Sequence, residues 1–467
     1  MKDKRILWLF IASLLVRLFL VFIHTDVKLV HEMNGYDYGA RSMLNGQGFV
    51  CTEERGYRAF LPPGYSFFLA GVYWLFGHSF FAARFIQAIL GALTVVFAYV
   101  LTRQMFAEKV ARLGAWILAF YPESVQFADL MQTETVFLFL FLLAMVFFVR
   151  SLSADTAEPT MAKSAKGGPW PNLVAAGLLF GVSALVRSII MFYLPLVIGF
   201  FLIFKRDRRM IVRSVIVTLI MLAAIAPWTI RNYVVLDAFV PINTKAGWDF
   251  FQHNHSGIYY IVRNLSDEPG EDEADRLATD ENGHIDELKL SRVCQKLALK
   301  WIFENPHIFI FKGVRMQWNL YSLERTFFVN LRQGYYGLVP KWMLFIAGPY
   351  MGLPFLLLLP LAVVGFVHIK KDNLYLRLIL VLFGYFSAIA FAAFLFYRQR
   401  YPLLPFLCCF AAYAILNRKA ILADIKSASC DRSAKRRAIV AASLILFFAI
   451  GWLIDIGMSL ATLKNTF

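Results

Sequence analysis

Charged residues are scarce in this chain of 467 residues: they make up only 17% of it, whereas hydrophobic residues make up 59%. A soluble domain carries about a quarter charged residues, so this balance excludes an ordinary soluble domain. The apolar residues are also clustered in runs, such as 137–149 and 439–454. A helix needs roughly 20 apolar residues to cross a bilayer. The composition therefore predicts an all-α polytopic membrane protein.

Other signals are missing as well. The five cysteines show no spacing typical of metal ligands and, being odd in number and scattered, give no disulfide framework. No internal repeat is evident, which disfavours the transporters that are built from repeats. No small-residue cleavage site follows the basic and then apolar N-terminal segment, so we expect an uncleaved first span.

The formal net charge is +16, but its distribution argues against a nucleic-acid partner. The basic residues lie in short clusters between apolar runs and do not form one continuous patch. Lys and Arg next to spanning helices mark the cytoplasmic side of a membrane. We therefore interpret the positive charge as a topology signal.

The basic clusters assign the apolar segments to sides. Lys2, Lys4 and Arg5 place the N-terminus in the cytoplasm. Segment 65–77 is too short to span comfortably, so we predict an interfacial helix in the first outer loop. The predicted spans number about eleven, and they are 6–24, 81–102, 111–127, 133–150, 171–187, 188–204, 211–228, 342–367, 374–396, 402–417 and 438–460.

This topology divides the chain into three parts. Residues 1–235 form a membrane module with acidic outer loops, and residues 236–340 form a large extracytoplasmic loop. Residues 341–467 form a C-terminal membrane module.

The predicted topology collects acids and arginines at the outer membrane surface. The acids are Glu32 and Asp37 in the first outer loop and Asp129 and Glu134 in the second. Arginines follow at the outer ends of later spans, namely Arg187, Arg231, Arg398 and Arg400. Charges at the edge of hydrocarbon are costly and usually have a partner or a purpose.

Two interpretations of this collection stay open. The groups can pair with one another and fix the loops, and arginines can snorkel to lipid headgroups. Alternatively, arginine forks bind phosphate in a bidentate way, and a carboxylate deprotonates an acceptor hydroxyl or amine. The second combination is what transfer of a sugar from a lipid phosphate requires.

Several motifs resemble the glycosyltransferase-C superfamily, in the branch of protein mannosyltransferases and lipid A aminoarabinose transferases. The similarity covers most of the chain and is strongest over residues 1–235. The motifs are Glu32-(x3)-Tyr36-Asp37, Gly46-Gln-Gly48, Pro62-Pro63-Gly-Tyr65, Tyr121-Pro122, Thr133-Glu134, Leu185-Val-Arg187, Pro227-Trp-Thr-Ile-Arg231-Asn232 and Arg400-Tyr-(x3)-Pro405. The resemblance makes 1–235 the catalytic module.

The resemblance also implies roles for these residues. Glu32 matches the family's acceptor-activating base, which is usually Asp, and Asp37 is the alternative. Glu134 is expected to orient the acceptor or help hold a divalent metal, with Asp129 the weaker candidate. Four arginines are expected to hold the lipid-linked phosphate: Arg187, Arg231, Arg398 and Arg400. Arg58 is the candidate for a role that a lysine has in some relatives.

The expected function is therefore that of an inverting membrane glycosyltransferase with an extracytoplasmic active site. Its donor is a polyprenyl-phosphate-linked hexose or pentose, and its acceptor a protein, a lipid or a cell-envelope glycan. No cofactor is certain, and a divalent metal is left open. The short loops suggest a bacterial or archaeal plasma membrane. The alternatives are a flippase or transporter of lipid-linked sugars and a non-catalytic scaffold of the same fold.

Overall fold

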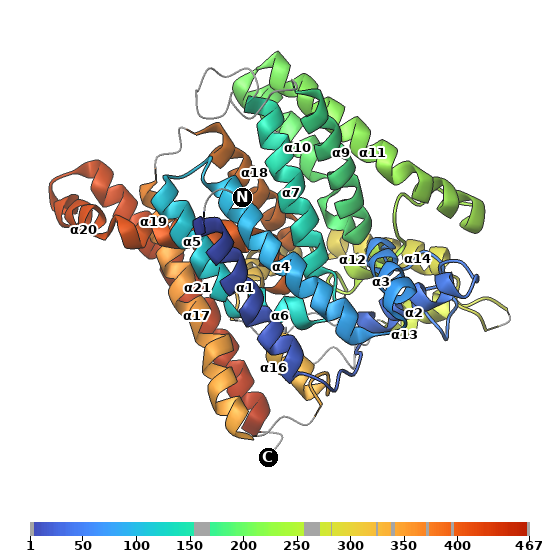
Figure 1. Ribbon diagram of the computed structural model, residues 1–467. Helices are drawn as coiled ribbons and strands as arrows, with labels where there is room; N and C mark the ends of the chain where they lie inside the picture. Colours follow the sequence, from blue (N-terminus) through green and yellow to red (C-terminus); the bar gives the residue numbers. More distant parts are fainter. Residues whose placement is uncertain are drawn as a thin grey trace.

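The computed structural model describes residues 4–153, 169–255, 271–281, 283–323, 326–337, 341–369, 373–393 and 397–464 (Figure 1). Within these ranges the chain is built from helices, and nine of them are long and apolar enough to cross a membrane. The predicted all-α polytopic architecture is therefore confirmed.

The first half of the bundle is a row of helices packed in sequence order. It contains α1 (Lys4–Ile23), α4 (Phe80–Thr102), α7 (Glu134–Ser153), α9 (Trp170–Val186) and α11 (Arg208–Leu236), and each contacts the next. Gly177 and Gly181 lie one turn apart on α9 and approach Ile220 and Ala224 of α11. Small residues at this spacing let two membrane helices pack closely.

The second half packs against the first through α10 (Tyr193–Phe200), which contacts α18 (Leu374–Ala392). The remaining long helices are α17 (Lys341–His368), α19 (Leu404–Leu416) and α21 (Arg432–Lys464). Helix α19 lies between α17 and α5 (Glu108–Phe120). A short helix, α20 (Arg418–Lys426), projects from the bundle (Figure 1).

The nine apolar helices correspond to nine of the predicted spans. The other two, 111–127 and 171–187, form as shorter helices. Segment 171–187 is α9, and 111–127 is divided into α5 and α6 (Pro122–Asp129). Tyr121 between them is extended. Pro122 has no N–H and disfavours a helical residue before it, so the helix cannot continue through this point.

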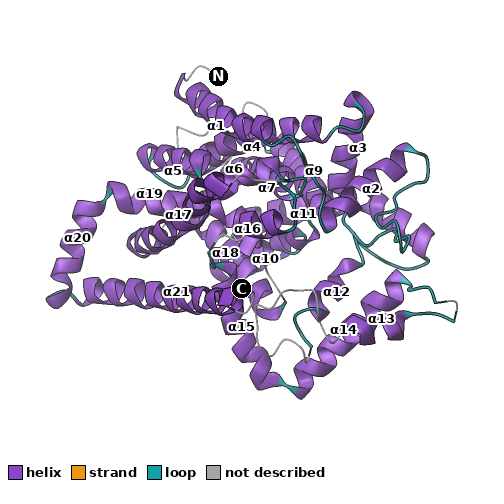
Figure 2. Cartoon of the chain, turned by 90° about the horizontal axis from the view of Figure 1, so that it is seen from below, coloured by secondary structure: helices purple, strands orange, loops and turns teal. Residues whose placement is uncertain are grey.

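The outer loops form a layer at one end of the bundle (Figures 1 and 2). It includes α2 (Glu32–Leu44), α3 (Gly64–Phe76), α12 (Lys245–Phe251), α13 (Glu271–Ala278) and α14 (Glu287–Glu304). The Glu287 carboxylate accepts hydrogen bonds from the backbone N–H groups of Arg58 and Ala59, at 3.0 and 3.1 Å. Arg55 pairs with Asp275 at 2.8 Å. The first outer loop and the large loop are therefore held together.

The large loop continues through α15 (Pro306–Leu320) and α16 (Thr326–Arg332) back to the bundle. Beyond α18, the 3-10 helix η4 (Tyr397–Leu403) leads into α19. Helix η4 contacts α7, α15, α18 and α19. Its side chains therefore lie where the loop layer meets the spans.

Candidate active site

Glu32 is the first residue of α2, where the free N–H groups of a helix favour a carboxylate. Both of its carboxylate oxygens are paired with cations. Oε1 lies 2.9 Å from Nζ of Lys245 in the large loop. Oε2 lies 3.2 Å from Nη2 of Arg398 on η4. The Glu32 side chain is 32% exposed, so it can be reached from outside the protein.

Glu134 begins α7 and lies on the other side of Arg398. Its Oε1 atom is 2.7 Å from Nη1 of Arg187 and 3.9 Å from Nε of Arg398. Arg187 follows the last residue of α9 and also donates a hydrogen bond to Gln399. Only 2% of the Glu134 side chain is exposed. These contacts bring together four of the residues that the sequence analysis placed at the outer surface, namely Glu32, Glu134, Arg187 and Arg398.

The large loop adds a cation and an acid that sequence reasoning missed. Lys245 and Asp249 lie one turn apart on α12 and form an ion pair. Their i, i+4 spacing was the only available signal, and it is common on exposed helices. We call the six residues Glu32, Glu134, Arg187, Lys245, Asp249 and Arg398 the ion-pair cluster.

The electrostatics of the ion-pair cluster favour the charged forms of Glu32 and Lys245. Burial disfavours the charged form of Glu32, but Lys245 and Arg398 outweigh it and hold the pKa of this carboxyl well below its usual range. Burial also opposes the charge on Lys245, but Asp249 and Glu32 raise the pKa of its ammonium above the ordinary value. Burial raises the pKa of Asp249.

Asp37 lies outside the ion-pair cluster, although it is only five residues from Glu32. Its carboxylate accepts hydrogen bonds from Arg41 and from the Tyr73 hydroxyl, each at 2.8 Å, and pairs with His78 at 2.8 Å. Tyr73 is on α3 and His78 follows it. Asp37 therefore holds α2 against α3.

Arg231 and Arg58 support the first outer loop. The Arg231 guanidinium donates to the carbonyls of Arg58 and Phe49, at 2.7 and 3.0 Å, and stacks over the ring of Trp228. The indole of Trp228 donates to the carbonyl of Ile242 at 2.8 Å. In the described residues, neither arginine is paired with Glu32 or Glu134.

Arg400 and Asp129 lie deeper, in separate buried pairs. Arg400 pairs with Glu123 at 3.2 Å, and both side chains are fully buried. Asp129 contacts Nδ1 of His24 at 2.6 Å and Nη1 of Arg84 at 2.8 Å. The sequence pointed to Arg400 and Asp129 but not to their partners, because nothing in the local sequence relates positions so far apart.

The carboxylates do not form a recognisable metal site. Among the described residues, no group of three His, Cys, Asp or Glu side chains has a metal-binding arrangement. Glu32 and Glu134 are instead engaged by Lys and Arg.

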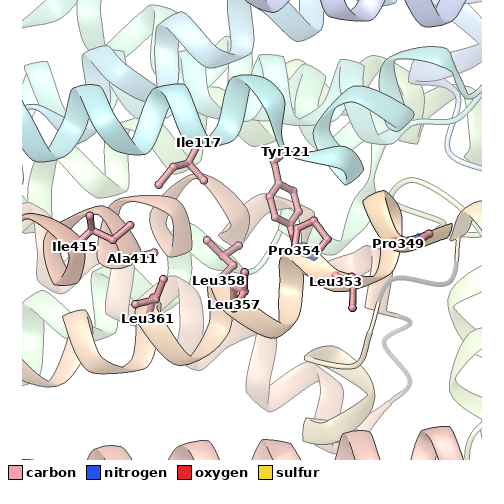
Figure 3. Close-up of a pocket in the computed structure, with 10 residues that line it drawn as sticks. All are labelled: Ile117, Tyr121, Pro349, Leu353, Pro354, Leu357, Leu358, Leu361, Ala411 and Ile415. Carbon is pink, nitrogen blue, oxygen red and sulfur yellow. The ribbon is translucent and has the colours of Figure 1, made fainter. Parts of the chain in front are cut away.

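An apolar groove runs along the bundle between α5, α17 and α19 (Figure 3). It is lined by Ile117, Tyr121, Pro349, Leu353, Pro354, Leu357, Leu358, Leu361, Ala411 and Ile415. The lining is hydrocarbon except for the Tyr121 hydroxyl. Tyr121 lies two residues before the buried acid Glu123. The groove suits a hydrocarbon chain better than a polar ligand.

Comparison with known proteins identifies the fold. Residues 61–230 match the family model of dolichyl-phosphate-mannose-protein mannosyltransferases. The oligosaccharyltransferase of Archaeoglobus fulgidus in its apo form aligns with 96% of this chain and 56% of its own, at 13% identity and a TM-score of 0.52. The structure of the same enzyme tethered to an acceptor peptide aligns with 96% and 54%, at 14% identity and a TM-score of 0.50.

A third structure, ArnT from Cupriavidus metallidurans bound to undecaprenyl phosphate, aligns with 90% of this chain and 80% of its own, at 16% identity and a TM-score of 0.43. A comparison with curated protein sequences finds no match. The chain spans about half the length of the oligosaccharyltransferase that it matches.

The chain is thus an integral membrane protein with a fold of the glycosyltransferase-C type. The resemblance found in the sequence is confirmed by the fold and by the family model over residues 61–230.

Proposed function

We propose that the chain is a glycosyltransferase that moves a sugar from a polyprenyl-phosphate donor to an acceptor at the extracytoplasmic membrane surface. The observation that carries this proposal is the ion-pair cluster. It joins three carboxylates to two arginines and a lysine, and these come from α2, α7, the end of α9, α12 and η4. Such a transfer needs a base that deprotonates the acceptor and cations that bind the donor phosphate, and the cluster contains both kinds of group.

Structural neighbours support the choice of donor. AglB from Archaeoglobus fulgidus, which shares the fold at a TM-score of 0.50, has a structure with an inhibitory peptide and a dolichol-phosphate. The apolar groove and the membrane-embedded bundle are also compatible with a donor that has a long hydrocarbon chain. We assign the sugar as a hexose or pentose and leave the acceptor as a protein, a lipid or a glycan.

In the proposed reaction Glu32 is the base. It takes the proton from the acceptor hydroxyl or amine while the acceptor oxygen or nitrogen bonds to the anomeric carbon with inversion. The bond between that carbon and the phosphate oxygen breaks, and the electron pair leaves with the lipid phosphate. We assign Arg398, Arg187 and Lys245, which pair with carboxylates of the ion-pair cluster, to stabilise the developing charge on that phosphate.

The contacts of the remaining candidate residues indicate their roles in the proposed reaction. Glu134 is buried against Arg187, so we propose that it orients the arginines. Asp37 is only 3% exposed and has three partners of its own, which favours Glu32 as the base. Arg400 is fully buried and paired, so we assign it a structural role. Arg231 and Arg58 shape the first loop that presents Glu32.

The test is sugar transfer by the purified protein in lipid vesicles, from labelled polyprenyl-phosphate sugars to an extract of host envelope. Glu32→Gln should lower the transfer rate by about 100-fold or more, as loss of a general base does. Glu304→Gln, a change of the same kind at an exposed site on α14, should leave the rate unchanged. Undiminished transfer by Glu32→Gln would contradict Glu32 as base, and no transfer by the wild type from any donor would contradict the function.

A further inference from the structure

Lys245 on α12 contacts the candidate base directly. Its ammonium contacts Oε1 of Glu32 at 2.9 Å, while Arg398 contacts the other oxygen. A carboxylate with both oxygens held by cations is a poor proton acceptor, because taking a proton weakens both ion pairs. In this arrangement Glu32 is therefore restrained as a base.

The charges of the ion-pair cluster balance. Among the described residues, it contains three carboxylates and three cations. The sugar donor is a phosphodiester with one negative charge, and its phosphate needs cations. Phosphate and Glu32 must then compete for the same positive groups. Each added negative charge weakens the attraction between these cations and the carboxylates that they already pair with.

Lys245 is better suited than Arg398 to change partners. It is a compact charge on a flexible stem, and it stays paired with Asp249 one turn away when it leaves Glu32. Arg398 lies beside both Glu32 and Glu134, and these two contacts restrict its movement. Lys245 can therefore exchange Glu32 for a phosphate without losing its pair with Asp249.

We propose that Lys245 is a switch cation that holds Glu32 in the free protein and passes to the donor phosphate on binding, which releases the carboxylate to act as base. The inference rests on the proposed function and deepens it. It makes Lys245 a phosphate-positioning residue and makes base activation depend on the donor. An acceptor, or water, that arrives before the donor meets a carboxylate that is still restrained.

Release of Glu32 by Lys245 makes the affinity for the donor depend on pH. The groups facing Glu32 are Tyr36 on its own helix, Lys245 and Asp249 on α12, Arg398 on η4, and Arg187 and Glu134 beyond them. The two cations hold the carboxyl pKa low in the free protein, and losing Lys245 raises it in the complex. Donor binding then takes up protons at pH values between these two pKa values, so affinity increases as the pH falls through the carboxyl pKa of the complex.

The experiment uses the full chain in lipid nanodiscs and measures binding of dihydrofarnesyl methyl phosphate. This probe is a phosphodiester whose single charge does not titrate near neutral pH, and it has no sugar to transfer. Removing the competing carboxylate in Glu32→Gln should tighten binding at pH 7 by about tenfold, within the usual range of coupling between sites. Wild-type affinity should approach that of Glu32→Gln as the pH falls, whereas the affinity of Glu32→Gln should depend less on pH.

A double-mutant cycle isolates Lys245. Lys245→Gln should weaken probe binding, and the gain from Glu32→Gln should disappear in the Lys245→Gln background. Glu304→Gln and Lys300→Gln, at an exposed pair on α14, should bind as the wild type does. Thermal unfolding of each variant confirms that it is folded.

The outcomes separate the inference from the function. If Glu32→Gln binds the probe no more tightly than the wild type and transfer still requires Glu32, the switch is overturned and the function stands. If neither protein binds the probe at any pH, the phosphate site itself is wrong and the function falls with it. If Glu32→Gln still tightens probe binding in the Lys245→Gln background, phosphate and Glu32 compete for Arg398. That result would overturn the role of Lys245.

Discussion

Glu32 and Asp37 lie on the same short helix, but their surroundings differ. Asp37 is buried and joins α2 to Tyr73 and His78, whereas Glu32 is partly exposed and faces cations from distant segments. One acid therefore stabilises the loop, and the other is available to a substrate. This contrast yields a prediction about stability.

We predict that Asp37→Asn lowers the free energy of unfolding by about 1–3 kcal/mol, because hydrogen bonds to a charged, buried group are worth about 1.5–3 kcal/mol and an amide keeps only part of them. Glu32→Gln should change stability less, since its ion pairs are partly exposed. Thermal unfolding in detergent, with both variants measured beside the wild type, checks this. Equal losses in the two variants would contradict the division of roles.

The residues of the ion-pair cluster differ in how far the sequence could identify them. Topology placed Glu32, Glu134, Arg187 and Arg398 at the same membrane surface. The same criterion also selected Asp37, Asp129, Arg231 and Arg400, which have other partners, so tertiary contacts were needed to separate the two sets. Lys245 and Asp249 could not be found this way. They lie in a long polar loop, where charged residues are common. Every residue of this loop is on the same predicted side of the membrane, so topology does not separate site residues from the others.

Helix α3 shows how an element positions the site. Its first residue, Gly64, packs against the backbone at the end of α9, where a Cβ would lie 2.7 Å from the carbonyl carbon of Leu185 and from the nitrogen of Val186. Arg187 of the ion-pair cluster follows directly. The close approach of two backbones at this point therefore sets the distance between the first outer loop and Arg187.

We predict that Gly64→Ala separates α3 from α9, destabilises the protein by about 1–3 kcal/mol as overpacking does, and reduces sugar transfer. Gly71→Ala is the matched control on the same helix, because nothing lies within 4 Å of its added Cβ. Alanine is the better helix former by about 0.5–1 kcal/mol, so this control should be neutral or stabilising. Thermal unfolding and the transfer assay measure both effects. A Gly64→Ala protein as stable and active as the control would contradict the packing argument.

At the level of elements, hydrophobic runs located the spans well, because crossing hydrocarbon demands length and apolar character. The break at Tyr121 was not predicted, even though Tyr121-Pro122 was noted as a motif. A proline ends or kinks a helix according to whether its neighbours can satisfy the freed backbone groups, and that depends on tertiary packing. The buried pairs Arg400–Glu123 and Arg84–Asp129 depend on tertiary packing in the same way.

Across the whole molecule, the two ends of the bundle differ in charge. The ion-pair cluster and the loop layer occupy one end. Helix α19 starts at η4 beside the cluster and leads away from it to α20, where basic residues such as Arg418, Lys419 and Lys426 gather. Thirteen helical residues separate these points along α19, a rise of about 20 Å at 1.5 Å per residue. From the positive-inside rule we expect the basic end to lie in the cytoplasm.

This assignment predicts which surface a membrane-impermeant maleimide reaches. Of the five cysteines only Cys430 is exposed, so replacing it with Ser gives a background in which the other four are buried. In that background Glu53→Cys, in the exposed turn before α3, should be labelled in right-side-out vesicles, and Lys419→Cys only in inside-out vesicles. The reverse pattern would place the ion-pair cluster in the cytoplasm. The donor sugar would then be used on the side where nucleotide-activated sugars are also present, and the extracytoplasmic part of the proposed function would have to be withdrawn.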